Sequence, residues 1–334
     1  MICLGIESTA HTFGVGITDE KCRVLANEKS VFCAEAGEGI KPREAAEHHV
    51  ANAKRVISEA IGKAGISAKE IGLIAFSLGP GLGPCLEVGA TAARALSLKY
   101  DLPIIGVNHP IGHIEIGKAK TNCSDPIVAY VSGGNSQIIG YGEGRYRVYG
   151  ETLDIGVGNL LDMFGRKLGI GFPAGPVLDR MYFESSEMIE LPYTVKGMDL
   201  NFSGLYTAAT KKIGSTKKEA LAHSLLHTAF AMVTEITERA LAHTGKNEVL
   251  LTGGVAASRA LREMMQKMCS ARKAKMFVPE PALCTDNGAM IAWLGILMHK
   301  AGNRMAIGET IPIQRFRADQ VNANWVKGKK GKFH

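Results

Sequence analysis

The chain is short of aromatic residues, and it has no apolar run long enough to cross a bilayer. Aromatic residues make up 6% of its 334 positions, and a membrane-spanning helix would need about 20 consecutive apolar residues. The first residues enter an apolar strand pattern at once, without the basic and apolar regions of a signal peptide. A cytoplasmic protein that is not inserted in a membrane is therefore expected.

The cysteine pattern argues against a disulfide framework and against a thiolate zinc site. The seven cysteines are odd in number and widely scattered, and no two of them are spaced as CxxC. Buried thiols in a reducing compartment are the expected state. The chain likewise lacks a Walker phosphate loop and the GxGxxG fingerprint of dinucleotide-binding proteins.

Glycine and positive charge are what the chain has in excess. Its 39 glycines cluster at the ends of expected strands, and its formal net charge is +7. The basic excess is concentrated in residues 315–334, which end in VKGKKGKFH. A basic surface favours polyanions such as tRNA. The simpler interpretation of the last eight residues is a solvated tail or a linker, which could lead into a further domain.

Strands alternate with helices along the whole chain. The first half predicts three strands within 1–32 and a turn at 35–42. An amphipathic helix is expected over 42–65, a strand over 71–84, a helix over 86–100 and a strand over 102–108. The second half predicts a three-strand meander over 126–151 and helical regions over 156–181 and 217–244. A strand leading into a helix is expected over 247–268, a strand over 275–280 and a last helix over 285–302. We expect Thr285 or Asp286 to cap that last helix. Such alternation implies a mixed or parallel sheet covered on both faces.

Both halves open with a three-strand meander whose first turn is small and polar, GIESTAHTFGVGI in one and AYVSGGNSQIIGY in the other. This faint duplication predicts two α/β domains that face each other across a cleft. Actin, Hsp70 and the sugar kinases share that architecture, in which paired hairpin turns hold the phosphates of a nucleotide. We expect one lobe over 1–125, a second over 126–314, and a basic tail or linker over 315–334. The last helix is free to pack back on the first lobe.

Two glycine turns are candidates for binding an anion. In SGGN, residues 132–135, the glycines leave backbone N–H groups open to an anion, and Ser132 and Asn135 add donors. A plain tight hairpin explains the same turn. Gly253 and Gly254 lie between a strand and a helix, where they could cradle a phosphate or seat a purine ring. Tight packing of the strand on the helix is the alternative.

Three acidic residues punctuate the glycine-rich stretch 151–180. They are Asp154, Asp162 and Asp179. A carboxylate at the mouth of a cleft can accept hydrogen bonds from ribose hydroxyls. Asp154 and Asp162 would share one face if their helix were continuous. Helix caps and surface acids are the alternative interpretation.

Two histidines four residues apart, His109 and His113, could both reach one metal ion from a helix. The zinc-peptidase motif HExxH is disfavoured, because Pro110 stands where that motif has its glutamate. Pro110 suits the first turn of a helix, which puts His109 at the end of a strand. Tyr130 and Asp286 are candidates for further ligands, and two imidazoles with oxygen ligands suit zinc or iron. Spacing alone leaves ordinary helix-surface histidines open.

A second pair, His223 and His227, has the same spacing but lies among apolar residues in the middle of an expected helix. We expect these two side chains to serve packing.

Seven segments taken together resemble a known family. In order they are NHPIGHIE, YVSGGNSQI, GETLDIGVGNLLDMFGRKLG, GFPAGP, KGMDLNFSGL, TGGVAASRALR and CTDNGAMIAW. They are similar to the universal tRNA threonylcarbamoyladenosine (t6A) transferase family, the catalytic subunit of the archaeal and eukaryotic KEOPS complex. This family is related to bacterial TsaD and was formerly called O-sialoglycoprotein endopeptidase. The likeness runs from residue 1 to about residue 317, and it implies the two-lobed actin-like fold.

The resemblance also implies roles for individual residues. Its metal ligands, for one iron or zinc ion per subunit, correspond to His109, His113, Tyr130 and Asp286. Its adenylate-binding positions correspond to Ser132, Gly133, Gly134, Asn135, Asp162, Gly175 and Asp179, to which the glycine-turn pattern adds Gly253 and Gly254. The family usually has Asn at position 258, whereas this chain has Ser258, and a contact of Ser258 with the nucleotide is therefore in doubt.

The implied activity is transfer of the threonylcarbamoyl group from threonylcarbamoyl-AMP to N6 of adenosine 37 in tRNAs that read ANN codons. The implied partners are tRNA, a kinase-like ATPase, a small dimerising subunit and a third small protein. Two alternatives stay open: an ATP-dependent kinase or ATPase on the same fold, and a non-catalytic tRNA-binding scaffold. The basic C-terminal stretch could contact tRNA or join the kinase partner, as in some archaeal fusions.

Overall fold

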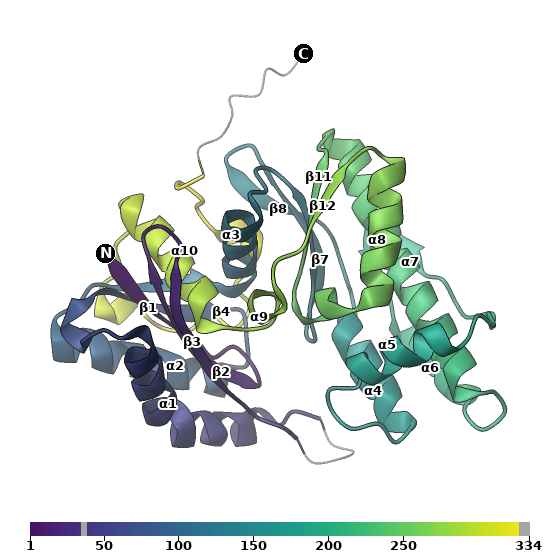
Figure 1. Cartoon of the computed structure of the whole chain (residues 1–334), viewed down its shortest axis with the longest axis horizontal. Coiled ribbons are helices and arrows are strands. Elements are labelled where there is room, and N and C mark those ends of the chain that lie inside the picture. Colours follow the sequence, from purple (N-terminus) through teal and green to yellow (C-terminus); the bar gives the residue numbers. More distant parts are fainter. Residues whose placement is uncertain (35–38, 327–334) are drawn as a thin grey trace.

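The computed structural model describes residues 1–34 and 39–326, and they form two lobes, each built on a five-stranded mixed sheet (Figure 1). The predicted alternation of strands and helices is confirmed. The expected turn at 35–42 falls partly outside the described residues. The last eight residues of the chain fall wholly outside them. None of the described helices combines the length and apolar character needed to cross a bilayer.

The first sheet has the strand order β3-β2-β1-β4-β5. Its strands are β1 (Ile2–Glu7), β2 (Thr12–Asp19), β3 (Val24–Val31), β4 (Ile71–Gly79) and β5 (Ile104–Asn108). The first three form an antiparallel meander, and β4 and β5 add in parallel to β1. Two helices, α1 (Pro42–Ala64) and α2 (Gly83–Tyr100), pack against it. Alternate apolar residues of the strands are buried between these helices and the sheet.

The second sheet repeats the same plan, with the order β12-β11-β6-β7-β8. Its strands are β6 (Ile127–Val131), β7 (Ser136–Gly142), β8 (Arg145–Glu151), β11 (Glu248–Thr252) and β12 (Lys275–Phe277). A meander again comes first, and two parallel strands follow. The helices of this lobe are α4 (Val157–Lys167), α5 (Gly175–Glu184), α6 (Ser203–Lys211), α7 (Lys218–Thr244) and α8 (Arg259–Ala271), with a short ribbon of β9 (Val195–Lys196) and β10 (Asp199–Leu200). The internal duplication expected from the two meanders is therefore present in the topology.

One helix, α3 (His109–Thr121), lies between the two lobes (Figure 1). It follows β5 directly and contacts β6 and β11 of the second sheet. Its residues from His109 to Gly117 are all buried. Groups placed on its first turns are therefore enclosed by both lobes.

The last long helix, α10 (Gly288–Lys300), comes after the second lobe in sequence but packs on the first sheet. Glycines make this close approach possible, because a Cβ atom at Gly16 would lie 2.0 Å from the backbone nitrogen of Ala289. The expected cap was wrong: Asn287 caps α10 by accepting a hydrogen bond from the Met290 N–H at 3.0 Å. A short helix, α9 (Pro281–Cys284), precedes the turn that leads into α10.

The chain after α10 returns across the molecule. Met305 pairs with Ile104 at the edge of β5, and the Asn108 side chain donates to the carbonyl oxygen of Phe316 at 2.9 Å. Further on, Ala318, Val321 and Ala323 are buried in the core between the sheets. Of the stretch expected as a tail, residues 315–326 are thus packed on the protein.

The seven cysteines are free thiols, as expected. All except Cys33 are buried. Burial raises the pKa of the Cys85 thiol and of the Cys269 thiol to about 11. These two groups are therefore protonated at neutral pH and serve packing.

Candidate metal centre and nucleotide cleft

His109 and His113 lie on one face of α3, at the end nearest to β5. Asn108 caps the helix, because its side-chain oxygen accepts a hydrogen bond from the Ile111 N–H at 3.2 Å. Pro110 occupies the first turn, where its missing N–H leaves no intrahelical bond unmade. The spacing of four residues brings the two imidazole centroids to 4.8 Å. Their side chains are 6% and 0% exposed.

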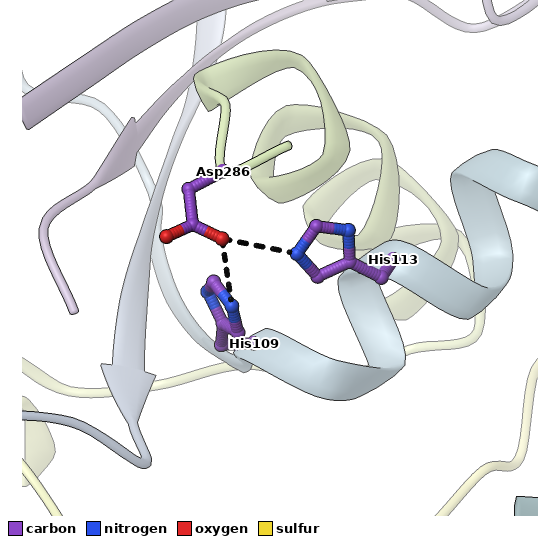
Figure 2. A group of neighbouring side chains, drawn as sticks. All are labelled: His109, His113 and Asp286. Carbon is purple, nitrogen blue, oxygen red and sulfur yellow. Dashed lines mark hydrogen bonds and ion pairs between the residues drawn. The ribbon is translucent and has the colours of Figure 1, made fainter. Parts of the chain in front are cut away.

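Asp286 completes a three-residue group from the turn before α10 (Figure 2). Its Oδ1 lies 3.4 Å from His109 Nε2 and 3.3 Å from His113 Nε2. The three ligand atoms all lie within 4.8 Å of one another. Two imidazole nitrogens and a carboxylate oxygen form a donor set that suits a divalent zinc or iron ion.

Tyr130, the fourth ligand expected from the sequence, is a neighbour of both histidines. It lies near the end of β6 and is 3% exposed. Its ring centroid is 5.3 Å from that of His113 and 6.4 Å from that of His109. Burial raises the pKa of the Tyr130 phenol, although His109 opposes the shift. A neutral phenol therefore borders the group, and its coordination of a metal stays a prediction.

Glu7 is a functional candidate that the sequence patterns did not single out. It ends β1, is fully buried, and places its Oε2 2.8 Å from His109 Nδ1. Its other oxygen accepts a hydrogen bond from the Thr9 N–H at 2.7 Å and one from the Thr9 hydroxyl. Donation of the Nδ1 proton to Glu7 leaves His109 Nε2 to face Asp286. An acidic residue at the end of the apolar run ICLGIE was the available signal.

The charges of the group balance around the two histidines. Burial lowers the pKa of His109, but Glu7, Tyr130 and Asp286 together raise it well above its ordinary value. Burial lowers the pKa of His113, only partly opposed by Asp286. For Asp286, burial favours the neutral acid, but the two histidines hold its pKa well below the usual range. Without a metal, the carboxylates beside His109 favour its protonated form, and His113 is a neutral imidazole. A metal ligand must be a neutral imidazole, so a bound cation would take the place of the His109 proton beside these carboxylates.

The SGGN turn connects β6 to β7 and is held by the N-terminus of α4. The Ser132 hydroxyl donates to the carbonyl of Asn135 at 2.8 Å. From α4, the Gly158 N–H donates to the Ser132 carbonyl and the Asn159 N–H to the Gly133 carbonyl, both at 3.1 Å. No heavy atom lies within 4 Å of where a Cβ of Gly134 would be. The turn is thus fixed on one side and open on the other.

Two further glycines of this region were not predicted. A Cβ on Gly156 would lie 2.4 Å from the Gly133 carbonyl oxygen, and one on Gly158 would lie 2.8 Å from the Gly133 Cα. Only glycine at both positions lets α4 seat on the SGGN turn. The repeated glycine in GVG, just before a helix, was the signal.

Asp154 and Asp162 do not share a helix face, so that expectation was wrong. Asp154 precedes α4 and accepts hydrogen bonds from the N–H groups of Phe202 and Ser203, at 3.0 and 2.8 Å, which anchors the start of α6. Asp162 lies on α4 and accepts from the Ala174 N–H at 2.9 Å, just before Gly175 begins α5. Burial raises the pKa of Asp162.

Asp179 and Ser258 lie together at the start of α8. The Ser258 hydroxyl donates to Asp179, which also accepts from the N–H groups of Arg259 and Ala260, at 3.0 and 3.2 Å. Ser258 in turn caps α8 by accepting from the Leu261 N–H at 3.2 Å. These side chains hold a helix N-terminus in place. Ser258 therefore has a structural partner in the candidate nucleotide region.

The glycines that precede α8 differ in their surroundings. Gly253 has a φ of +93°, and a Cβ there would lie 2.3 Å from the carbonyl oxygen of Val131. The close approach of the chain after β11 to the end of β6 therefore requires glycine at this position. Gly254 has no heavy atom within 4 Å of a Cβ position.

One contact crosses from the first lobe to the second near these groups. The ring of His11, in the turn after β1, meets the ring of Phe172 edge to face at 5.7 Å between centroids. Phe172 lies in the connection between α4 and α5, next to Gly175. The first turn of one lobe thus reaches the candidate adenylate region of the other.

The pair His223 and His227 serves packing, as expected. Both rings stack on Tyr182 of α5, with centroids 4.5 and 6.4 Å away. His223 Nδ1 also lies 2.8 Å from the Tyr182 carbonyl. Neither histidine belongs to a metal-binding group of the described residues.

Comparison with known proteins decides the family. Residues 23–293 match the profile of TsaD, the tRNA N6-adenosine threonylcarbamoyltransferases. The chain belongs to this family. The tRNA N6-adenosine threonylcarbamoyltransferase of Thermococcus kodakarensis is 54% identical over 327 residues, 97% of this chain and 100% of the relative. The resemblance carried by the sequence motifs is confirmed.

Some relatives of this family are longer than this chain. A probable bifunctional tRNA threonylcarbamoyladenosine biosynthesis protein of Methanothermobacter thermautotrophicus is 55% identical over 328 residues. That match covers 98% of this chain but 61% of the relative. The chain therefore spans less than two thirds of the bifunctional protein.

Solved structures of low sequence identity share the fold. HypF of T. kodakarensis gives a TM-score of 0.63 at 15% identity, covering 93% of this chain and 48% of HypF. A ROK family glucokinase of Streptomyces griseus gives a TM-score of 0.51 at 13% identity, covering 88% and 99% of the two chains. The predicted actin-like architecture is confirmed by this likeness.

Proposed function

We propose that this chain catalyses transfer of the threonylcarbamoyl group of threonylcarbamoyl-AMP to N6 of adenosine 37 in tRNAs that read ANN codons. The observation that carries the proposal is the group of His109, His113 and Asp286, two buried histidines and a partly buried aspartate, in a chain of this family. Relatives over half identical along their full length are named tRNA N6-adenosine threonylcarbamoyltransferases.

His109, His113 and Asp286, with Tyr130 beside them, would hold one divalent zinc or iron ion. The donor atoms suit either metal, and three protein ligands leave a coordination position open for substrate. Such an ion, when bound, supplies Lewis-acid stabilisation of the negative charge that develops on the carbamoyl oxygen. Glu7 would keep His109 in one tautomer and one ring orientation.

The rest of the site would bind and orient the adenylate. The open face of the SGGN turn (Ser132, Gly133, Gly134 and Asn135) would hold its phosphate through backbone N–H groups. Asp162, Gly175 and Asp179, from α4 and α5, would contact the rest of the adenylate. Gly253, Gly254 and Ser258, which precede α8, would contact it as well. A phosphate fixed in this way leaves the acyl group in a single orientation toward the metal centre.

Orientation matters because the N6 amine of adenosine is a weak nucleophile, its lone pair being delocalised into the purine. In the reaction a bond forms between N6 and the carbamoyl carbon, and the bond from that carbon to the phosphate oxygen breaks. AMP leaves with the electron pair of the broken bond, and the N6 amine releases one proton. The chain contributes by holding the leaving phosphate and the acyl carbon in line with the incoming amine.

We propose tRNA, a kinase-like ATPase and small dimerising subunits of a KEOPS complex as partners, with the reaction in the cytoplasm. The greater length of the bifunctional relatives accords with a second activity that works beside this one. The net charge of +7 suits a tRNA substrate.

The competing function is phosphoryl transfer, which the likeness to a glucokinase of the same fold favours. A kinase needs a carboxylate base beside a sugar hydroxyl and oxygen ligands for magnesium. The centre here instead has two buried imidazoles around its carboxylate. Incubation with ATP and sugars, followed by a search for phosphorylated sugar, separates the two functions, and we expect no product.

The deciding experiment is a reconstitution. The reaction contains the protein, its partners, unmodified tRNA and threonylcarbamoyl-AMP. After incubation the tRNA is digested, and its nucleosides are identified by mass spectrometry. We expect threonylcarbamoyladenosine to form with the unaltered chain. Its absence, with the adenylate intact and the tRNA competent for a known transferase, contradicts the proposal.

A further inference from the structure

A buried glutamate lies on the same helix as the two histidines. Glu115 is two residues beyond His113 on α3 and is 5% exposed. Its Oε1 accepts hydrogen bonds from the Tyr146 hydroxyl and from Trp325 Nε1, the latter at 3.0 Å. Lys118 Nζ lies 3.3 Å from Oε2. A buried carboxylate is costly unless donors surround it, and Glu115 has three.

Both tryptophans of the chain donate to this one residue. Trp325 reaches the Glu115 side chain, and Trp293 Nε1 donates to the Glu115 backbone carbonyl at 3.2 Å. The two indoles come from different elements, α10 and the C-terminal segment 317–326. Tyr146 belongs to β8 of the second lobe. Glu115 therefore joins α3 to three separate parts of the fold.

The positions of these donors matter for the metal centre. Asp286 directly precedes α10, so the bond from Trp293 to α3 fixes the helix of the third ligand against the helix that carries His109 and His113. A metal centre must hold its ligands to within about 0.5 Å of the productive geometry. The packing of α3 on α10 and the hydrogen bonds at Glu115 are the contacts that set this distance.

We propose that Glu115 is a positioning residue for the metal ligands, and that the C-terminal segment, through Trp325, sets the metal affinity of the centre. This inference rests on the proposed binding of a divalent metal by His109, His113 and Asp286. Trp325 bonds to the Glu115 side chain and Trp293 of α10 to its backbone carbonyl, so loss of the Trp325 hydrogen bond frees α3 to shift. The histidines then no longer meet Asp286 at the distances seen here.

The test compares zinc affinity with stability in the full chain. Zinc is titrated against a competing chelator, and the free energy of unfolding is measured in urea for each variant. We expect Trp325→Phe, which keeps the ring but removes the N–H donor, to weaken zinc binding about three- to tenfold, less than loss of a partner bonded directly to a ligand. Tyr146→Phe should act in the same direction.

Two comparisons separate positioning from a general packing role. Tyr141→Phe removes a neighbouring hydroxyl, which bonds to the Val326 carbonyl and not to Glu115, and zinc affinity should be unchanged. Glu115→Gln keeps one side-chain oxygen that can accept from both Tyr146 and Trp325, and it should bind zinc more tightly than Glu115→Ala.

The outcomes are distinct. If the unaltered chain binds zinc but Trp325→Phe and Tyr146→Phe bind it equally well, the positioning role is overturned while the metal centre stands. If the variants lose only unfolding free energy, the same conclusion holds. If the unaltered chain binds no divalent metal, the proposed function itself fails at the centre, and this inference fails with it.

Discussion

Glu7 Oε2 lies 2.8 Å from His109 Nδ1, although the two residues are 102 positions apart in sequence. The contact joins the end of β1 to the first residue of α3 and is wholly buried. It gives His109 a carboxylate partner at Nδ1 in addition to Asp286 at Nε2. His113 Nδ1 has no hydrogen-bond partner among the described residues. The two imidazoles of the centre are therefore inequivalent.

Glu7→Gln should weaken zinc binding, because an amide cannot accept the His109 proton with the strength of a carboxylate. Outer partners of metal-bound histidines typically contribute about 10- to 100-fold in affinity, and we expect a loss in that range. Chelator competition measures it. The substitution Thr9→Val removes a hydroxyl that donates to Glu7 and lies 3.3 Å from His109 Nδ1, but it keeps the carboxylate and should have a smaller effect. Equal affinity in Glu7→Gln and the unaltered chain would show that His109 needs no such partner.

The double change His109→Ala with His113→Ala should abolish both bound metal and transfer while leaving the fold intact. Metal content by elemental analysis, circular dichroism and the nucleoside assay check the three parts. The matched control is His223→Ala with His227→Ala, which has the same spacing but stacks on Tyr182. Transfer by a metal-free His109/His113 double variant would remove the centre from catalysis.

Gly133→Val should weaken adenylate binding with little cost to stability. The nearest atom to a Cβ at this position is the Asn159 side-chain oxygen at 3.7 Å, so the protein interior accepts the added atoms. They would instead crowd the turn proposed to hold the phosphate. Calorimetry with a non-hydrolysable adenylate measures the loss, with Gly308→Val, also in open space, as the control. Unaltered affinity in Gly133→Val would take the SGGN turn out of the site.

Asp154→Ala should lower the free energy of unfolding by about 1 kcal/mol at neutral pH, as loss of a helix cap does. Burial opposes ionisation of Asp154, but hydrogen bonds from Phe202 and Ser203 hold its pKa well below the usual range. A depressed pKa stabilises the fold above the unfolded value of about 3.9, and this contribution is lost as the pH falls further. The difference in the free energy of unfolding between the unaltered chain and Asp154→Ala should therefore become smaller in acid.

Urea unfolding of both proteins at pH values from neutral to below about 3.9 measures this difference in the free energy of unfolding. The substitution Glu190→Ala, at an exposed position outside this network, serves as the control and should show no such difference. A difference between Asp154→Ala and the unaltered chain that stays constant in acid would mean that the carboxylate charge does not anchor α6.

Local patterns were enough for the elements and for two residues of the centre. Pro110 after an apolar run predicted the first turn of a helix at the end of a strand, and the spacing of four put His109 and His113 on the same face. Repetition of the meander predicted two similar sheets. These inferences need only the geometry of a single helix or strand and the apolar periodicity that buries it.

Several features had no local signal strong enough to find them. The expectation for Asp154 failed because the helix begins only at Val157, and the Asp154 partners lie 48 and 49 positions away at α6. The cap of α10 was assigned to Asp286 or Thr285, but Asp286 turns to the histidines and Asn287 takes the cap. In each case a long-range contact replaced the local role that the residue type favoured.

The sequence by itself determined the periodic elements, the duplicated plan and the pair of histidines on one helix face, because these follow from backbone geometry and from burial over a few residues. Only the tertiary structure decided that Glu7 and Asp286 both contact His109, and that both indoles donate hydrogen bonds to Glu115. Those contacts depend on how sheet and helix layers pack, and packing is set by side chains that are distant in the chain.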